Sequence, residues 1–343
     1  MKILFALAFS LALAGGASAA PAKYPHVVDG SFTGQDGSRV LEQSTEIEAP
    51  AAVLFYAYVN PAEFARWNAP KSWNELRVGG TLEASYQVTA KQGDAANIKH
   101  RLITFLPNRL IVFHNIQTPP GFPHPEVFQK TYVVLRYLPL SQTRTRVSIA
   151  LTGFGDTPAD KQIEGFFRDG NAQLLEKMKA VYDGAKTTAP ALPTGERLLV
   201  QSIDIKGTAA CAWKAYTDEA TLKASGIPFV RVELKNGGVL EEGFSPQPKP
   251  GETIRHGIIT YLPERLIVLR NETTPPGLPG AALYPKVVQV VSVEPQPDSR
   301  VRLTIAHTGY GSGGDWDGLY GFFKEHNPEF LTATKAACEK AAH

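Results

Sequence analysis

The stretch Ile98-Lys-His-Arg-Leu-Ile-Thr-Phe-Leu-Pro-Asn-Arg-Leu-Ile-Val-Phe113 occurs a second time, with few changes, as Ile254-Arg-His-Gly-Ile-Ile-Thr-Tyr-Leu-Pro-Glu-Arg-Leu-Ile-Val-Leu269. The similarity continues beyond these segments, and 16 of the 26 positions in 98–123 are identical to their partners in 254–279. The spacing of 156 residues, from 98 to 254, is much longer than the roughly 20–50 residues of a solenoid repeat. The chain therefore contains two copies of one domain, and we expect a function that a single domain of about 150 residues can carry.

The composition limits the class of protein. The chain has 343 residues, which is long enough for two domains of ordinary size. Its 43% of apolar and 20% of charged residues are typical of a globular protein. The formal net charge is +2, and Lys and Arg form no cluster. Because a nucleic-acid-binding protein usually presents a basic patch, we expect no nucleic-acid partner.

Residues 1–19 have the pattern of a secretory signal peptide. Lys2 supplies a positive charge, an apolar run extends from Ile3 to Ala14, and Ala17-Ser18-Ala19 is a small-residue cleavage site. The apolar run is shorter than the about 20 residues that span a bilayer, and no later segment is long and apolar enough. An uncleaved anchor is the alternative. We expect an exported protein, periplasmic in a Gram-negative source, with no transmembrane segment after signal cleavage.

The two cysteines, Cys211 and Cys338, lie near opposite ends of the second copy. The first copy has the apolar residues Val53 and Tyr182 at the corresponding positions, which indicates two buried helix faces. An oxidising compartment permits a disulfide, and closing so long a loop would contribute about 4 kcal/mol in the chain-entropy model. Two reduced core thiols are the alternative. Neither cysteine has a Cys or His neighbour at ligand spacing, so we expect no metal site there.

Each copy is expected to begin with a half-buried strand, because apolar and charged side chains alternate there. Pro50 opens a short helix that ends near Tyr58, and Asn60 caps a second short helix. Segments rich in β-branched and aromatic residues predict strands at 81–90, 97–105, 109–116, 127–138 and 144–153. A final helix carries apolar residues at helical spacing, namely Ile163, Phe166, Phe167, Leu174, Met178 and Tyr182.

The resulting order is one strand, two short helices, a run of antiparallel strands and one long helix. Strands and helices stay in separate runs, which predicts an α+β fold with a sheet wrapped around the last helix. The predicted divisions are a signal peptide (1–19), an extended leader (20–39), a first domain (40–184), a Pro-containing linker (185–196) and a second domain (197–343).

Several short motifs in this order resemble the START/birch-pollen-allergen (SRPBCC) superfamily, whose members have the helix-grip fold. Within it, both copies are similar to the C-terminal domain of the activator of the heat-shock-protein-90 ATPase. The second copy departs from the pattern at Ser225, where the first copy has Trp67. The resembling motifs are Ala49-Pro-Ala-Ala-Val53, Asn60-Pro61 before Trp67, Val78-Gly-Gly80, Leu106-Pro-Asn-Arg-Leu-Ile-Val112 and His307-Thr-Gly-Tyr-Gly311.

The resemblance implies that each domain encloses a small hydrophobic or amphipathic ligand, such as a lipid-like or polyketide-like molecule. One alternative that it implies is an enzyme of the cyclase or hydratase type. The other is a protein-interaction module of the cell envelope. Export does not fit a role on a cytoplasmic ATPase, because its partner and its ATP lie in the cytoplasm.

The sequence contains no strong catalytic constellation, and no motif for a nucleophile elbow, a zinc protease or a phosphate-binding loop. We therefore expect no metal and no cofactor. His100 and His256 occupy equivalent strand positions, and they are the only repeated candidates for acid–base chemistry. Their alternative role is structural. An enzyme would need both a cavity and a partner for one of these imidazoles.

Ligand sites are concave and mostly apolar, with a few polar groups. Gln43 and Gln201 lie on the apolar face of the first strand in each copy, so each amide needs a partner, either in a ligand or within the protein. The loop 118–123 either rims an opening or forms a stiff turn. The aromatic candidates, each of which could instead belong to the core, are Trp67, Phe105, Phe113, Phe122, Phe154, Phe166, Tyr261, Tyr310 and Phe322.

Overall fold

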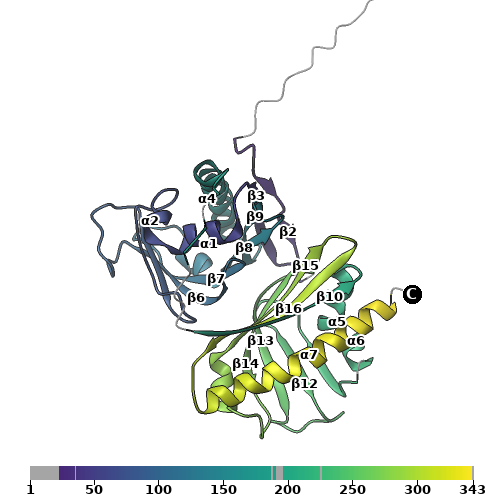
Figure 1. Cartoon of the computed structure of the whole chain (residues 1–343). Helices are drawn as coiled ribbons and strands as arrows, with labels where there is room; N and C mark the ends of the chain where they lie inside the picture. Colours follow the sequence, from purple (N-terminus) through teal and green to yellow (C-terminus); the bar gives the residue numbers. More distant parts are fainter. Residues whose placement is uncertain (1–22, 35, 187, 191–195, 225, 342–343) are drawn as a thin grey trace, which may run out of the picture.

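The computed structural model describes residues 23–34, 36–186, 188–190, 196–224 and 226–341 (Figure 1). The expected signal peptide lies outside these residues, as does much of the expected linker. Two antiparallel sheets, each with a long C-terminal helix, form the molecule. The predicted α+β architecture with two tandem helix-grip domains is therefore confirmed.

The first domain contains a sheet with the strand order β1-β3-β9-β8-β7-β6-β5-β4, and β2 pairs with the opposite end of β3. Every described pairing is antiparallel, and α4 packs on the sheet. Its elements are β1 Val28–Asp29, β2 Phe32–Thr33, β3 Arg39–Ile47, α1 Ala51–Val59, α2 Pro61–Phe64, β4 Lys71–Asn74, β5 Thr81–Ser85, β6 Ile98–Leu106, β7 Leu110–Gln117, α3 Pro125–Lys130, β8 Tyr132–Pro139, β9 Thr145–Phe154 and α4 Pro158–Tyr182.

The second domain repeats this plan with the strand order β10-β16-β15-β14-β13-β12-β11. Its long helix α7 packs on β10. Its elements are β10 Arg197–Lys206, α5 Ala209–Thr217, α6 Glu219–Ala224, β11 Phe229–Val232, β12 Val239–Gly243, β13 Thr253–Leu262, β14 Leu266–Thr273, the 3₁₀ helix η1 Ala281–Lys286, β15 Val288–Gln296, β16 Arg300–Tyr310 and α7 Asp315–Ala341.

Local chemistry explains where the helices of the first domain begin. The Asn60 side chain accepts hydrogen bonds from the backbone of Ala62 and Glu63, which caps α2. Thr157 and Asp160 form a capping box at the start of α4, where Pro158 occupies the first helical position. The helix then continues through Gly170 to Tyr182, because its buried stripe offsets the low helix propensity of one glycine.

The structure differs from the sequence prediction in the segment before β8 and in the leader. The segment 127–138 was expected to be one strand, but its first residues belong to helix α3, and β8 begins at Tyr132. Val127 and Phe128 favour a strand by composition, yet Pro125 at the first helical position opens a helix that buries both side chains. Two parts of the leader, Val28–Asp29 and Phe32–Thr33, pair with β3 and so extend the sheet.

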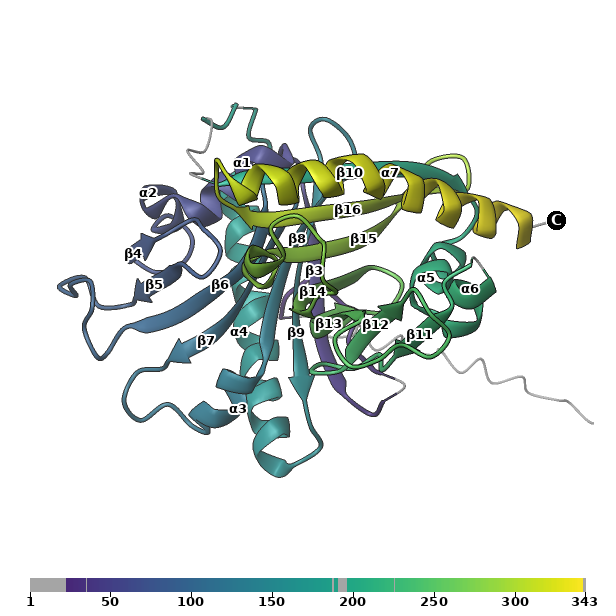
Figure 2. The same cartoon turned by 90° about the horizontal axis from the view of Figure 1, so that it is seen from below.

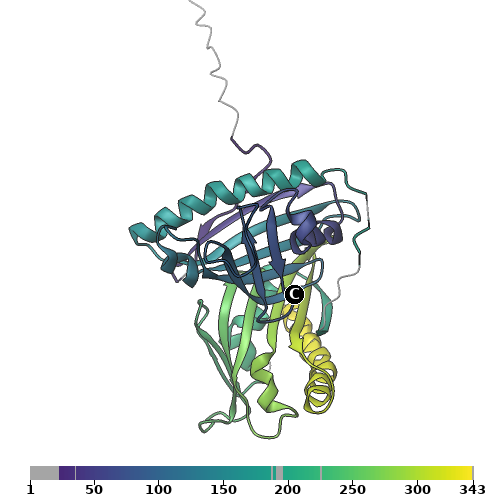
Figure 3. The ribbon, with the colours of Figure 1, turned by 90° about the vertical axis from the view of Figure 1, so that its left-hand side faces the viewer.

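The two domains pack through the outer faces of their sheets, so that both sheets lie between α4 and α7 (Figure 3). Seen from below, β15 and β16 cross the strands of the first sheet (Figure 2). A buried apolar cluster joins the two faces, and it includes Val112, Val134 and Ala150 from one domain with Val268 and Val290 from the other. The central part of the second face of each sheet is therefore also removed from water.

Two hydrogen bonds at the centre of this interface have the same geometry. The hydroxyl oxygens of Thr104 and Thr308 are 2.8 Å apart, and those of Thr152 and Thr260 are 2.6 Å apart. Thr260 is the counterpart of Thr104 in the second copy, and Thr308 is the counterpart of Thr152, both at the spacing of 156 residues. The two contacts are therefore equivalent, and an approximate two-fold axis relates the domains.

A disulfide joins Cys211 of α5 to Cys338 of α7, at a sequence separation of 127 residues. Cys338 is buried and belongs to the core of the second domain. The bond connects the short helix that follows the first strand of this domain with the long helix that ends it.

Candidate functional site

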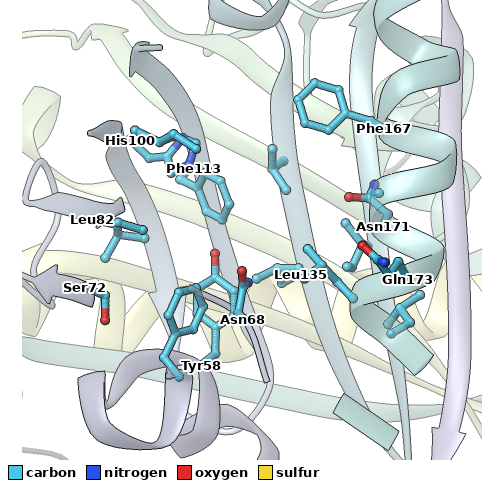
Figure 4. Close-up of a pocket in the computed structure, with 18 of the residues that line it drawn as sticks. Tyr58, Asn68, Ser72, Leu82, His100, Phe113, Leu135, Phe167, Asn171 and Gln173 are labelled. Atoms are coloured by element: carbon cyan, nitrogen blue, oxygen red, sulfur yellow. The ribbon is translucent and has the colours of Figure 1, made fainter. Parts of the chain in front are cut away.

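A cavity of about 660 Å³ lies between the sheet and α4 in the first domain (Figure 4). Its wall is built from α1, α2, the strands β4 to β9, α3 with the segment before it, and α4. The side chains of Phe167, Asn171 and Gln173 come from α4, while His100, Phe113 and Leu135 come from the strands that face it. The volume is within the range of small-molecule sites.

Aromatic rings form much of this wall. The rings of His100 and Phe113 are 4.6 Å apart at their centroids, and those of Phe128 and Phe167 are 4.4 Å apart. Phe166 is 53% exposed although it lines the cavity, so it lies where the cavity opens to solvent. Such a wall favours a flat or flexible apolar guest, because aromatic surfaces provide large contact areas.

Four polar atoms in the wall have no hydrogen-bond partner among the described residues. They are Ser72 Oγ, His100 Nδ1, Tyr137 OH and Asn171 Nδ2. Ser72, Tyr137 and Asn171 are each more than nine-tenths buried. A buried polar atom without a partner costs about 1–3 kcal/mol, so these atoms are the places where a guest could form stabilising hydrogen bonds.

Burial keeps two central titratable groups of this wall, His100 and Tyr137, uncharged. Burial lowers the pKa of His100 to about 3, with a smaller effect from His114, so the imidazole is neutral at pH 7. Burial also raises the pKa of the Tyr137 hydroxyl well above its usual value. The central polar groups are therefore uncharged donors and acceptors, which suits a guest with hydroxyl or carbonyl groups rather than a strong ion.

The structure brings together five of the residues singled out from the sequence. Trp67, Phe113, Phe122, Phe166 and His100 all line the cavity. The Trp67 ring nitrogen donates to the backbone oxygen of Ala57 over 3.0 Å, so its ring contributes apolar surface. The loop 118–123 contributes Thr118, Pro119 and Phe122 to the wall.

Three other candidates of the first domain lie away from the cavity. Phe105 and Phe154 are completely buried in the hydrophobic core, at the ends of β6 and β9. Gln43 is buried on β3, and its Oε1 has no hydrogen-bond partner among the described residues. The period-two pattern places these side chains on the inner face, but it does not say how far along the strand the cavity extends.

The candidates of the second domain do not gather around one described cavity. Gln201 donates from Nε2 to the backbone oxygen of Lys324 over 2.9 Å, which is a hydrogen bond within the protein. Tyr261 and Tyr310 are buried, and the ring of Phe322 stacks on His326 with centroids 4.3 Å apart. His256 Nε2 is 2.9 Å from the hydroxyl of Tyr284.

The second interior is more polar than the first. Gln289 Nε2 donates to the Tyr216 hydroxyl over 2.8 Å, and His307 Nδ1 is 3.2 Å from the hydroxyl of Tyr310. At the positions of Gln289 and His307 the first copy has the apolar residues Val133 and Leu151. The two domains share a fold, but their interiors offer different chemistry to a guest.

Sequence reasoning missed several residues that determine the polarity of the cavity, namely Tyr58, Ser72, Tyr137, Phe167 and Asn171. One signal was available for Asn171. Its counterpart in the second copy is Asn327, at the same spacing of 156 residues as His100 and His256. Both Asn side chains are buried on the long helix with an unpartnered Nδ2. A repeated buried amide on an otherwise apolar helix face therefore marks the inner wall.

Leu is the residue that the first copy has at the position of His307. Replacing His307 with Leu should make the free energy of unfolding depend less steeply on pH at acid pH. Burial, with a smaller effect from His256, lowers the pKa of His307 to about 3. In the unfolded chain a His titrates near about 6.5. As the pH falls below that value the unfolded state takes up a proton that the folded state does not, so stability is lost by about 1.4 kcal/mol per pH unit. Urea unfolding between pH 7.5 and 5 measures the slope, and parallel profiles for wild type and variant would contradict this assignment.

Among the described residues, no group of three or more His, Cys, Asp or Glu is arranged to hold a metal ion. None of the helices in the described part of the chain has both the length and the apolarity needed to cross a membrane.

These features define a protein with two helix-grip domains, of which the first encloses an apolar cavity. Residues 48–183, which cover most of the first domain, match the family described as "Activator of Hsp90 ATPase homolog 1-like protein". The resemblance that the sequence motifs predict is thereby confirmed for the first domain, and the second domain repeats its fold.

Several solved structures are similar to this chain. The protein MLL2253 from Mesorhizobium loti is 19% identical, with a TM-score of 0.35, and the match covers 43% of this chain and 100% of that one. The di-domain ARO/CYC BexL from the BE-7585A biosynthetic pathway is 16% identical, with a TM-score of 0.33, and covers 89% and 99%. The Aha1 dimer from Colwellia psychrerythraea is 14% identical, with a TM-score of 0.34, and covers 43% and 98%. No curated protein matches the chain.

Proposed function

We propose that this protein binds a small hydrophobic or amphipathic molecule in the cavity of its first domain. The observation that carries the proposal is the combination of an apolar, aromatic wall with four unpartnered polar atoms inside it. Apolar burial provides the binding free energy, at about 25 cal/mol per Å². The polar atoms select guests that carry neutral hydrogen-bonding groups.

The helix-grip fold supports the same ligand class, since the resemblance implies lipid-like or polyketide-like guests. A cyclase or hydratase activity would require an acid–base pair in this cavity. His100 does face the cavity as a neutral imidazole. However, no described residue forms a hydrogen bond with its ring nitrogens that would orient it as a base. Binding is therefore the function that the geometry supports best.

Two experiments test binding directly. Organic extraction of the purified protein, followed by mass spectrometry, should release a small apolar compound. Titration of emptied protein with the uncharged fluorophore N-phenyl-1-naphthylamine should show saturable binding at about one site per chain. A preparation that carries no extractable compound and gives no saturable fluorescence would contradict the proposal.

Replacing Tyr137 with Phe should separate polar selection from apolar burial. We expect about a 3- to 10-fold loss of affinity for 1-naphthol and no change for naphthalene, because only the hydroxyl compound can pair with the Tyr137 hydroxyl. The free energy of unfolding should stay constant or rise, since the variant removes a buried unpartnered group. Tyr132→Phe is the matched control, because Tyr132 lies on the other face of β8, against the domain interface, and does not line the cavity. Equal losses for both compounds would show that the hydroxyl has no selective role.

We also propose that the protein is exported, most simply to a periplasm. The pattern of residues 1–19 suggests export, and the Cys211–Cys338 disulfide supports it independently, because such bonds persist in oxidising compartments. Cell fractionation, with mass spectrometry of the mature N-terminus, tests this proposal. We expect a chain that begins at Ala20 in the soluble exported fraction, and a chain that retains Met1 in the cytoplasm would contradict it.

A further inference from the structure

A second pocket, of about 330 Å³, lies between the two domains on one side of their interface. Its floor is the outer face of β3, β8 and β9, and its opposite wall is the turn that contains Pro263 and Arg265, together with Pro295 and the start of α5 at Ala209. We call it the Arg136 pocket, and its lining residues are Gly30, Glu42, Ser44, Arg136, Leu138, Arg146, Ser148, Ala209, Pro263, Glu264, Arg265 and Pro295. None of these residues lines the cavity of the first domain.

The register of the sheet places donors side by side on the floor of this pocket. Ser44 pairs with Ser148 on the neighbouring strand, and Ser148 pairs with Arg136 on the next one. Two hydroxyl groups and a guanidinium therefore form a row across three adjacent strands. Arg146 lies two residues before Ser148 on the same face of β9, and Arg265 reaches the pocket from the second domain.

Most of the charges around the pocket are paired, and the two charged lining residues that form no ion pair within the described part of the chain are Arg136 and the carboxylate Glu264. Arg265 forms an ion pair with Glu42, and Arg146 is 2.7 Å from a carboxylate oxygen of Glu46. Arg136 forms no ion pair or hydrogen bond with any described residue. Burial lowers the pKa of the Arg136 guanidinium, and the nearby charges of Glu42 and Arg265 act in opposite directions on it.

The Arg136 side chain is part-buried, and a guanidinium that is partly desolvated without a direct partner carries an energetic penalty, because Arg stays charged and cannot lose its proton. A negative ion in the pocket would remove this penalty. Tetrahedral oxyanions suit the donors that are present, since a guanidinium binds two of their oxygens at once and serine hydroxyls can reach the others. The N-terminus of α5, at Ala209, adds a favourable partial positive charge.

We propose that the Arg136 pocket binds a small oxyanion, either phosphate or the phosphate group of a small ester, with Arg136 as its principal ligand. The site takes donors from both domains, so an occupied pocket ties them together. The volume leaves room for a small organic group beside the phosphate. This proposal does not depend on the apolar cavity, and either one can fail without the other.

The approximate two-fold symmetry provides an internal comparison. At the equivalent positions on the other side of the interface, the second domain has Ser292 in place of Arg136 and Val200 in place of Glu42. Arg302 corresponds to Arg146, and it pairs with Asp204 through contacts of 2.8 and 3.1 Å. The guanidinium without a partner, that of Arg136, thus occurs on only one of these two sides of the domain interface. We therefore expect one bound oxyanion per chain.

Calorimetric titration of the full chain with inorganic phosphate, at ionic strength held constant with chloride, tests the proposal. The wild type should bind one phosphate, and its Tm should rise by about 5 °C at a concentration 100 times the Kd. Arg136→Gln should weaken binding by about 10- to 150-fold. Arg302→Gln, the matched control, should leave the affinity unchanged within about 2-fold. Repeating the titration with sulfate and with glycerol 3-phosphate shows whether the site selects a free ion or an ester.

Stability in the absence of phosphate gives a second, independent readout. Arg136→Gln should be as stable as the wild type or more stable, because it removes a part-buried charge that has no direct partner. Should that variant fail to fold, Ser148→Ala keeps the guanidinium and should still reduce phosphate affinity by about 3- to 10-fold. Absence of phosphate binding by the wild type, or equal binding by the wild type and Arg136→Gln, would overturn the proposal.

Discussion

Leu135→Trp should abolish most ligand binding without unfolding the protein. Leu135 lies on β8 in the middle of the cavity wall (Figure 4), and a larger side chain there would occupy space that the guest needs. If the indole keeps one ring of N-phenyl-1-naphthylamine out of the cavity, the binding free energy becomes less favourable by about 1.5–3 kcal/mol. This corresponds to about a 10- to 100-fold loss of affinity. The Tm should change little, because the indole enters existing space instead of an already packed core.

The matched control is Leu140→Trp. Leu140 follows β8 at the surface and is 38% exposed, so the same substitution there leaves the cavity unchanged. Fluorescence titration of both variants, with circular dichroism to verify the fold, measures the difference. If Leu135→Trp bound the fluorophore as tightly as Leu140→Trp does, the probe would be binding elsewhere and the cavity would have no role in its uptake.

Removing the disulfide should have the largest effect on stability. Cys211 and Cys338 close a loop at a sequence separation of 127 residues, and the chain-entropy model assigns about 4–5 kcal/mol to a loop of this length. We expect the double variant Cys211→Ala, Cys338→Ala to lose about 2–5 kcal/mol in the free energy of unfolding, measured with urea. The loss should fall mainly on the second domain, because both helices belong to it.

Dithiothreitol provides the control for this experiment. Reduction should destabilise the wild type by a similar amount and should leave the double variant unchanged. The first domain should still bind its apolar probe at urea concentrations that unfold the second domain of the variant. A variant that is as stable as the oxidised wild type would contradict a structural role for the bond.

These two predictions concern different domains, and they reflect how the copies have diverged. The first copy keeps an apolar cavity, whereas the second has Gln289 and His307 in its interior and a disulfide across two of its helices. His100 and His256 remain equivalent in position, but one lines the cavity and the other is 2.9 Å from the hydroxyl of Tyr284. A duplicated fold therefore does not imply two equal sites.

The repeat made much of the architecture predictable. It fixed the number of domains, and it showed that the second copy has the same order of elements as the first. The helix α3 was not predictable from composition, because Val127 and Phe128 have strand propensity and only the preceding proline favours a helix. Of the aromatic candidates in the first domain, Phe113, Phe122 and Phe166 line the cavity, while Phe105 and Phe154 fill the core beside it.

The amino-acid sequence by itself determined the duplication, the order of strands and helices, and the resemblance to the helix-grip superfamily. These follow from periodicity and short motifs, which are local properties of the chain. Only the tertiary structure decided which buried surface faces a cavity. Val112 and Phe113 are neighbours on β7 and both are buried, yet Val112 packs against the other domain and Phe113 lines the ligand cavity. A hydrophobic pattern predicts that a side chain is buried. Whether that side chain packs against protein or faces a cavity depends on residues that are far away in the chain.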